Sequence, residues 1–324
     1  MARLDTKKRA GLPDSAFAYI DSRGRRRLPI NDEPHVRNAL SRFNQVAFED
    51  DAGRELARKR LLKAAKKFGI VPIGFITGQI ASERRETKTV LKELKEAQKI
   101  QSGLLPRHAP EIPYSGVAGV SHACRSVGGD WFDYMPLPGG RLAVVLADVA
   151  GKGMGAALLM SSTRSIVRMV GGDGRSPSDV LAAVNHVLVK DLPAAKFVTM
   201  IYAVLDPGRR TVRFASAGHV PPVIFDGIGA RAIRVKPQFP LGIRDGDYRE
   251  HEVEMPERSR LILYSDGVIE ARDAASEEYG EERLLRYAAT PSASSKGLLA
   301  DVRGFMKKHP PADDITIVTV EALA

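Results

Sequence analysis

Four aspartates stand directly beside apolar, strand-like runs in four separate parts of the sequence. Each would lie just off the end of a buried strand, and glycine neighbours three of them. They are Asp130, Asp148, Asp266 and Asp313. Carboxylates gathered at one sheet edge need cations, because an unpaired buried charge is costly. The chain has one cysteine and no histidine pair at ligand spacing, so such oxygen ligands favour Mg²⁺ or Mn²⁺ over Zn²⁺.

The first two aspartates flank one sequence hairpin. Two apolar runs, 131–137 and 141–148, are joined by Pro-Gly-Gly, which favours a tight antiparallel turn. If the turn is centred on Gly139, the numbers of paired residues sum to about 278, so Asp130 lies opposite Asp148. Glycines crowd both acids, and we expect them to leave room for a ligand; they are Gly128, Gly129, Gly151, Gly153 and Gly155.

A purely structural interpretation of each acid stays open. An aspartate beside glycine at a strand end is usually a turn residue or a helix cap. Asp148 could cap a helix near Met154, and Asp266-Gly267 could be an ordinary turn. Four such positions in one chain are harder to explain in this way, so we favour a metal centre.

The elements that must position these acids lie beyond residue 112. Strand-like runs are expected at 117–124, 131–137, 141–148, 197–205, 211–216, 222–226, 260–265 and 315–321. Helices are expected at about 154–171, 176–190, 281–289 and 293–308. Strands that cluster around tight turns favour antiparallel hairpins, so the pattern predicts an α+β fold with two antiparallel sheets flanked by helices.

The first third of the chain differs in charge. Residues 1–105 contain 23 Lys or Arg and 13 Asp or Glu, so they hold the whole net charge of +10. A short hairpin at 17–30 and helices after Asp32 and at 51–68 predict a small, mostly helical domain. Its surface would suit an acidic partner, or would simply be a solvated helical face.

A linker helix is expected between these two parts, at 79–106. Val90, Leu94, Ala97, Gln101 and Leu104 repeat at coiled-coil spacing over only two heptads. The seam could pack on its own domain or pair with a second copy in a homodimer. No apolar run reaches the length of a membrane span, and the single cysteine, Cys124, with no secretory signal predicts a cytoplasmic protein.

The wording of the motifs resembles one family. The pieces are AQKIQSGLLP, SVGGDWFDY, LADVAGKGMGAALLM, FVTMIYAVLD, FASAGHVPP, PLGI, LYSDGVIEARD, YGEERL and ADDITIVTV, in family order over about 97–322. As a set they resemble the bacterial SpoIIE/RsbU-like serine phosphatases of the metal-dependent protein phosphatase (PPM) family. After SDGVIEARD the family usually carries an Asn/Asp-x-x-Gly turn, and AASEEYG stands here instead. This loop lies beyond the expected metal site, where it would affect substrate recognition.

The resemblance implies a fold and a site. The fold would be the PPM-type α-β-β-α sandwich, and the cofactors two Mn²⁺ or Mg²⁺ ions. By motif match, Asp130 and Asp148 would hold both metals with the backbone carbonyl of Val149, while Asp266 and Asp313 would bind the second. Asp314, the residue after Asp313, is the alternative ligand at that position. Arg125 would contact the substrate phosphate. No protein nucleophile is needed, because metal-bound water attacks phosphorus.

The resemblance also implies a function and a division into domains. A regulatory or partner-binding domain at 1–78 and a linker or switch helix at 79–106 would precede a serine/threonine phosphatase domain at 107–324. The substrate would be a phosphorylated signalling protein, such as a STAS-type anti-sigma-factor antagonist. The alternative is a catalytically idle scaffold that acts through its basic N-terminal module. A metal phosphodiesterase or nuclease is disfavoured, because its histidine-rich ligand sets are missing.

Overall fold

The computed structural model describes residues 9–307 and 309–323. The chain divides into two compact units, Met1–Lys92 and Glu93–Ala324. None of the helices in the described ranges is long and apolar enough to cross a membrane.

The first unit is built from a hairpin and two helices. Strands β1 (Phe17–Ile20) and β2 (Arg26–Pro29) pair antiparallel. Helix α2 (Glu33–Arg42) and helix α3 (Asp51–Lys67) follow, with the short 3-10 turns η1 (Asp14–Ala16) and η2 (Phe43–Gln45). Asp32 caps α2 by accepting from the His35 backbone N–H, as the sequence predicts, and Asp50 caps α3 through Gly53.

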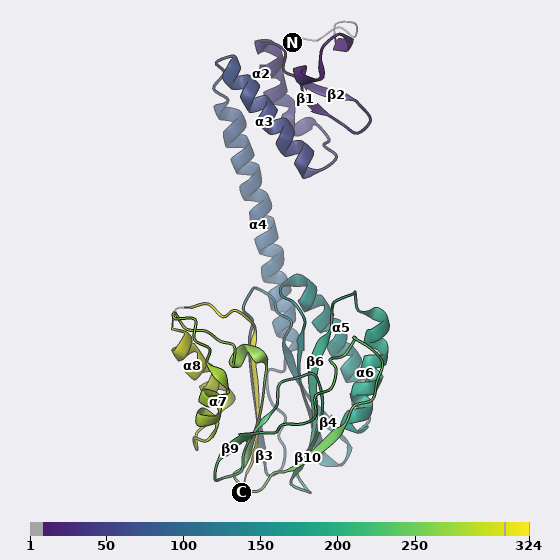
Figure 1. Cartoon of the computed structure of the whole chain (residues 1–324), viewed down its shortest axis with the longest axis vertical. Helices are drawn as coiled ribbons and strands as arrows, with labels where there is room; N and C mark the ends of the chain where they lie inside the picture. The colour runs from purple at the N-terminus through teal and green to yellow at the C-terminus, as the bar shows by residue number, and fades with distance from the viewer. Residues whose placement is uncertain (1–8, 308, 324) are drawn as a thin grey trace. The chain divides into compact units, whose positions relative to one another are not determined.

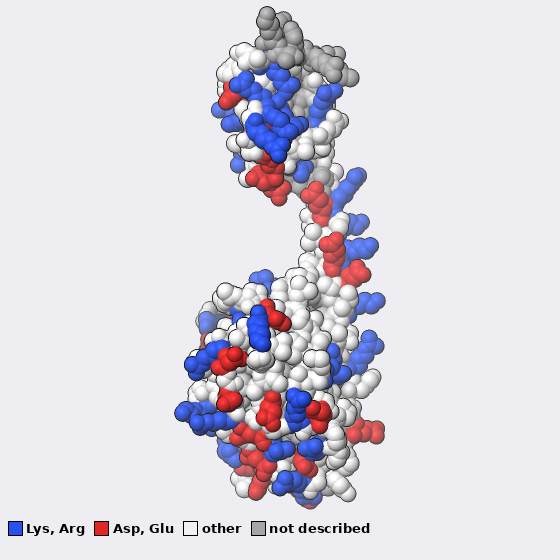
Figure 2. Space-filling view, turned by 90° about the vertical axis from the view of Figure 1, so that its right-hand side faces the viewer, with Lys and Arg blue, Asp and Glu red and all other residues white. Residues whose placement is uncertain are grey.

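The surface of this unit is basic along α3. Lys and Arg side chains gather on part of the unit in the face drawn in Figure 2. The exposed basic residues of α3 are Lys59, Arg60, Lys63, Lys66 and Lys67. The opposite side of α3 packs into a small core around Phe43 and Leu61, both fully buried. Part of the positive charge predicted for residues 1–105 therefore lies on an exposed face of α3.

Helix α4 (Ile73–Leu104) begins earlier than the expected linker helix. Pro72 stands directly before its first residue, where its missing N–H costs no helical bond. Gly74 and Gly78 lie inside the helix, although glycine lowers helix propensity. Of the expected seam, Val90 is exposed, whereas Leu94 and Gln101 are partly buried.

The second unit holds two five-stranded antiparallel sheets. One has the order β10-β7-β6-β5-β4 and the other β3-β12-β11-β8-β9. The first comprises β4 (Trp131–Leu137), β5 (Arg141–Val149), β6 (Val198–Asp206), β7 (Thr211–Ala217) and β10 (Glu250–Glu254). The second comprises β3 (Ser115–His122), β8 (Val223–Phe225), β9 (Ala230–Ala232), β11 (Arg260–Tyr264) and β12 (Ile315–Ala322).

Helices cover the outer face of each sheet. Helices α5 (Met154–Gly171) and α6 (Pro177–Asp191) lie against the first sheet, and α7 (Gly280–Ala288) and α8 (Ser295–Met306) against the second (Figure 1). Both faces of the central strands are thus buried. On the central strand β5, for example, Val145 packs toward α5 and α6 while Leu146 packs between the sheets. This is the α-β-β-α sandwich expected from the sequence.

The register of the predicted hairpin is confirmed. Trp131 of β4 lies opposite Ala147 of β5, so continuing the ladder by one residue places Asp130 opposite Asp148. The turn between them is a short 3-10 segment, η3 (Pro138–Gly140), in which Gly139 and Gly140 have φ of 78° and 72°. This left-handed backbone favours glycine, which explains the Pro-Gly-Gly sequence.

Candidate metal centre

The four predicted aspartates come from the ends of strands at one edge of the sandwich. Asp130 directly precedes β4, and Asp148 is the second-last residue of β5. Asp266 begins the 3-10 turn η4 (Asp266–Val268) after β11, and Asp313 stands two residues before β12. β4 and β5 are antiparallel neighbours, so Asp130 before β4 and Asp148 near the end of β5 lie at the same end of that pair. In the same way, the antiparallel pairing of β11 and β12 brings Asp266 and Asp313 to one end of the other sheet.

Burial and the charges of neighbouring acids raise the pKa values of three of these carboxyls. Burial, and then the negative charge of Asp148, raise the pKa of Asp130 well above its ordinary value. Burial followed by the charges of Asp266 and Asp313 raises the pKa of Asp148 to about 7. The pKa of Asp266 is also raised, by burial and then by Asp313. Each acid would therefore be stabilised by a nearby cation.

The donor set fits divalent metal ions. Asp130 is only 5% exposed, and its buried Oδ2 has no hydrogen-bond partner among the described residues. A Cβ built on Gly129 would lie 2.8 Å from the carbonyl oxygen of Val149, so that predicted ligand lies against the segment that carries Asp130. An unpartnered carboxylate oxygen beside a backbone carbonyl is suited to a hard cation such as Mg²⁺ or Mn²⁺.

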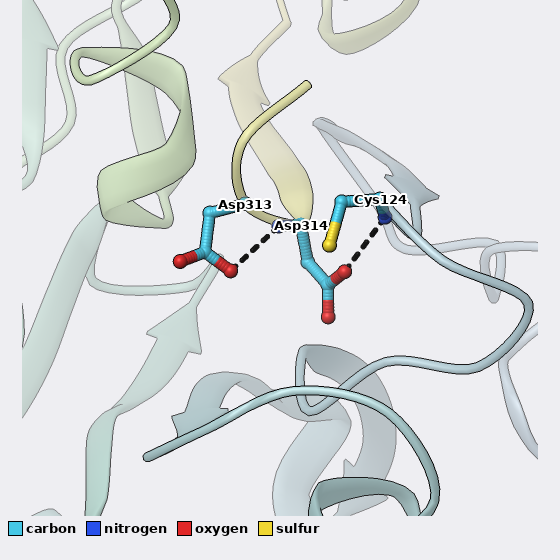
Figure 3. Close-up of side chains that lie close together, drawn as sticks. All are labelled: Cys124, Asp313 and Asp314. Atoms are coloured by element: carbon cyan, nitrogen blue, oxygen red, sulfur yellow. Dashed lines mark hydrogen bonds between the residues drawn. The ribbon is translucent and has the colours of Figure 1, made fainter. Parts of the chain in front are cut away.

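Among the described residues, the group of three candidate ligands whose atoms lie close together is a different set. Atoms of Cys124, Asp313 and Asp314 lie within 4.8 Å of one another (Figure 3). Burial, and then a hydrogen bond and charge from Asp314, raise the pKa of the Cys124 thiol to about 11. A thiol that keeps its proton is a poor metal ligand, because the thiolate is the form that binds metals. Of this group, Asp313 alone belongs to the predicted set.

Asp313 and its neighbour Asp314 have different surroundings. The side chain of Asp313 is 31% exposed and forms a 2.8 Å ion pair with Lys152, whose ammonium also donates to the Ala312 carbonyl. Asp314 is 5% exposed, and both its oxygens accept backbone N–H groups. Asp313 is thus the more accessible carboxylate. Lys152, which follows Asp148 by four residues, pairs with Asp313.

The sequence suggested that the glycines beside the acids leave space for a ligand, but not all of them do. A Cβ on Gly128 would lie 2.1 Å from Oδ2 of Asp314, and one on Gly267 would lie 2.0 Å from the Asp314 carbonyl oxygen. These two glycines are required because protein atoms approach them closely. Gly155, by contrast, has no atom within 4 Å of the built Cβ.

Arg125, the predicted phosphate contact, and His219 of the FASAGHVPP segment lie in different environments. Arg125 is exposed, and its Nη1 lies 3.8 Å from a Cβ built on Gly153, so it lies beside the loop after Asp148. His219 has both ring nitrogens turned into protein: Nδ1 contacts the Thr199 hydroxyl at 2.9 Å and Nε2 the Tyr264 carbonyl at 3.1 Å. Burial lowers the pKa of His219 to about 4. A neutral histidine held on both sides is a structural residue.

Comparison with known protein families places the chain among its relatives. The sequence model of Stage II sporulation protein E matches residues 138–323, more than half of the chain. The chain belongs to the SpoIIE family. A second match, to a family of unknown function (DUF6582), covers residues 5–72 in the first unit.

Three relatives of this SpoIIE-family chain illustrate its likeness. It is 28% identical to Protein IcfG of Synechocystis over 70% of this chain and 41% of that protein. It is 28% identical to the phosphoserine phosphatase RsbU of Bacillus subtilis over 62% of this chain and 61% of that protein. The phosphoserine phosphatase RsbP of the same organism is 25% identical over 71% of this chain and 58% of its own length. The matches thus span about half the length of these relatives.

Solved structures share the fold of the SpoIIE-family unit. The RsbU and RsbW domains of a Mycobacterium tuberculosis protein match with a TM-score of 0.56 and 29% identity over 66% of this chain and 62% of that one. The SiaA-PP2C domain of Pseudomonas aeruginosa gives a TM-score of 0.65 at 22% identity, covering 73% of this chain and 98% of that domain. The two-sheet sandwich is therefore the PP2C-type phosphatase fold.

Proposed function

We propose that this chain is a Mn²⁺- or Mg²⁺-dependent protein phosphatase that removes phosphate from phosphoserine or phosphothreonine. The observation that carries the proposal is the gathering of four carboxylates at one edge of the sandwich, those of Asp130, Asp148, Asp266 and Asp313. Burial and the charges of neighbouring acids raise the pKa values of Asp130, Asp148 and Asp266. The phosphoserine phosphatases RsbU and RsbP, to which the chain is similar, support the reaction class.

Separate residues of the proposed site would bind the metal ions and the substrate phosphate. The four carboxylates and the Val149 carbonyl would hold two divalent ions, which when bound supply a water activated for attack on phosphorus. Arg125, exposed beside the Gly153 loop, would bind the non-bridging phosphate oxygens through its planar guanidinium. Lys152 would release Asp313 to the metal and leave a positive charge at the rim.

The proposed substrate is a phosphorylated STAS-type anti-sigma-factor antagonist. The relatives RsbU and RsbP are named as phosphoserine phosphatases, which supports phosphoserine as the group that is hydrolysed. The basic unit at 1–78 would gate the reaction by binding an acidic partner, by moving the linker segment 79–106, or by bringing two copies together. The structure offers a route within the second unit, because Gln101 near the end of α4 is hydrogen bonded to Gly128 beside Asp130.

One assay tests the proposed activity. Hydrolysis of p-nitrophenyl phosphate and of a phosphoserine STAS protein is measured with Mn²⁺ for the wild type, Asp148→Asn and Asp226→Asn. Asp226 is a matched control, because its carboxylate accepts two backbone N–H groups in a turn after β8. β8 runs antiparallel to β11, so this turn lies at the far end of the strand pair from Asp266. We expect Asp148→Asn to lose at least about 100-fold in rate and Asp226→Asn to keep full activity.

Two other results would change the proposal. Absence of Mn²⁺-dependent turnover on both substrates would overturn the phosphatase and favour the idle scaffold. Turnover of the small substrate alone would retain the chemistry but reject the STAS protein as substrate.

Deletion of residues 1–78 should change the rate at equal metal and substrate, and an unaltered rate would reject gating by the first unit.

A further inference from the structure

The side chain of Asp314 lies buried at the centre of the loop that carries Asp130. Its Oδ1 accepts the backbone N–H of Cys124 at 2.8 Å, and its Oδ2 accepts that of Gly129 at 2.8 Å, with a longer contact of 3.4 Å from Asp130. All three donors belong to the segment 124–130, between β3 and β4. One carboxylate therefore fastens both ends of that segment.

Asp314 reaches this position without a cation. Among the described residues, no Lys, Arg or His side chain forms an ion pair with it. Its charge is compensated instead by backbone N–H groups, which bind a carboxylate more strongly than a neutral acceptor. Both oxygens are occupied in this way, so the side chain has less capacity left for a metal than Asp313 does.

The same residue also touches the other half of the centre. The Ser265 hydroxyl donates to the Asp314 carbonyl oxygen at 3.3 Å, and that oxygen leaves no space for a Cβ at residue 267. Ser265 and Gly267 flank Asp266. Gly128 of the GGD motif and Gly267 of the SDG motif thus share a physical cause, which is the close approach of Asp314 to each.

We propose that Asp314 is a positioning residue that fixes the backbone beside Asp130 and Asp266 in the geometry needed to bind metal, and that it is not itself a metal ligand. This role rests on the proposed function, because it concerns the same centre. A carboxylate is required here because all three donors are N–H groups. An asparagine could present oxygen to Cys124 or to Gly129 but would turn its own NH₂ toward the other.

The test compares Asp314→Asn with the wild type and with the turn control Asp226→Asn. Mn²⁺ binding is measured by calorimetry, and hydrogen exchange of the Gly129 and Asp130 amides by NMR in metal-free protein. For Asp314→Asn we expect a Mn²⁺ dissociation constant raised at least about 10-fold with an unchanged number of ions at saturation, and faster exchange at both amides. Asp226→Asn should change neither.

Each other outcome has a distinct meaning. A loss of one bound ion with the remaining site unchanged would make Asp314 a ligand and overturn the positioning role. A lower melting temperature with unchanged Mn²⁺ affinity and unchanged exchange would reduce it to a general structural residue and also overturn the role. A wild-type chain that binds no Mn²⁺ would overturn the proposed function and with it this role. If Mn²⁺ binds the wild type but Asp314→Asn behaves as wild type, only the positioning role fails.

Discussion

Gln101 and Gly128 exchange two hydrogen bonds. The Gln101 Nε2 donates to the Gly128 carbonyl at 2.7 Å, and the Gly128 N–H donates to Oε1 at 3.0 Å. Gly128 lies two residues before Asp130, so the last turns of α4 are joined directly to the segment that carries a proposed ligand. Motion of α4 would therefore reach the proposed metal centre through one side chain.

Replacing Gln101 should weaken metal binding. Gln101→Ala leaves both polar groups of Gly128 without this partner, and two lost hydrogen bonds of about 1 kcal/mol each would loosen the segment beside Asp130. We expect the Mn²⁺ concentration for half-maximal activity to rise about 10-fold. Gln98→Ala, an exposed position on the same helix, should leave it unchanged. Combining Gln101→Ala with deletion of residues 1–78 tests gating, since additive effects would mean that the first unit acts by another route.

Lys152 should oppose metal binding at Asp313. Its ammonium lies 2.8 Å from the Asp313 carboxylate, so it competes for that oxygen and adds positive charge beside the centre. Lys152→Met should tighten Mn²⁺ binding by about 3- to 30-fold in calorimetry. Lys236→Met removes the same charge from an exposed position and should have no such effect. Weaker binding by Lys152→Met would show that the lysine assists the metal instead.

His219 should affect stability at acid pH but not the chemistry. Burial lowers its pKa to about 4 in the folded chain, below the ordinary value of 6.5. The unfolded chain therefore takes up the proton first, and stability is lost as pH falls from about 6.5 toward 4. His219→Gln should show a smaller loss between pH 7.5 and 5.0, by about 1–2 kcal/mol in denaturant unfolding with chelator present.

The activity of His219→Gln gives a separate check. Its rate profile above pH 6.5 should have the same shape as that of the wild type, because both ring nitrogens are bonded to protein. Loss of an ionisation from that profile would identify His219 as a catalytic acid.

Gly267 and Gly155 should respond oppositely to alanine. The Cβ of Gly267→Ala would lie 2.0 Å from a backbone oxygen, which cannot turn away as a side chain can. We expect a loss of about 3 kcal/mol or more in unfolding free energy, measured in chelator. Gly155→Ala meets no atom within 4 Å in a helix, and should be neutral or stabilising by up to about 1 kcal/mol. Equal effects would refute close packing as the reason for Gly267.

Much of the sandwich could be predicted because its strands are buried on two faces. Such strands are uninterrupted apolar runs, and the Pro-Gly-Gly turn fixed the register that brings Asp130 opposite Asp148. The edge strand β10 escaped prediction, because its sequence EHEVE is polar. Edge strands have one unpaired side and often carry charge, so they lack the apolar signal.

The supporting contacts of the centre were less visible in the sequence. Gln101 stands at a heptad position, and its pairing with backbone groups of Gly128 leaves no pattern of residue types. Asp314 contacts backbone N–H groups, which every residue except proline has, so nothing in the sequence of 124–130 announces it. The adjacent glycines are the one signal, because they record a close approach without naming the residue that makes it.

The position of β12 has a consequence for how the molecule is made. This strand lies between β3 and β11, which are joined to each other only through it. A nascent chain would hold β3 and the hairpin of β4 and β5 long before residues 313–322 leave the ribosome. Of the residues of the proposed centre, Asp313 and its neighbour Asp314 would arrive last, so the centre would be incomplete until late in synthesis, and an unfinished chain would lack the proposed phosphatase activity.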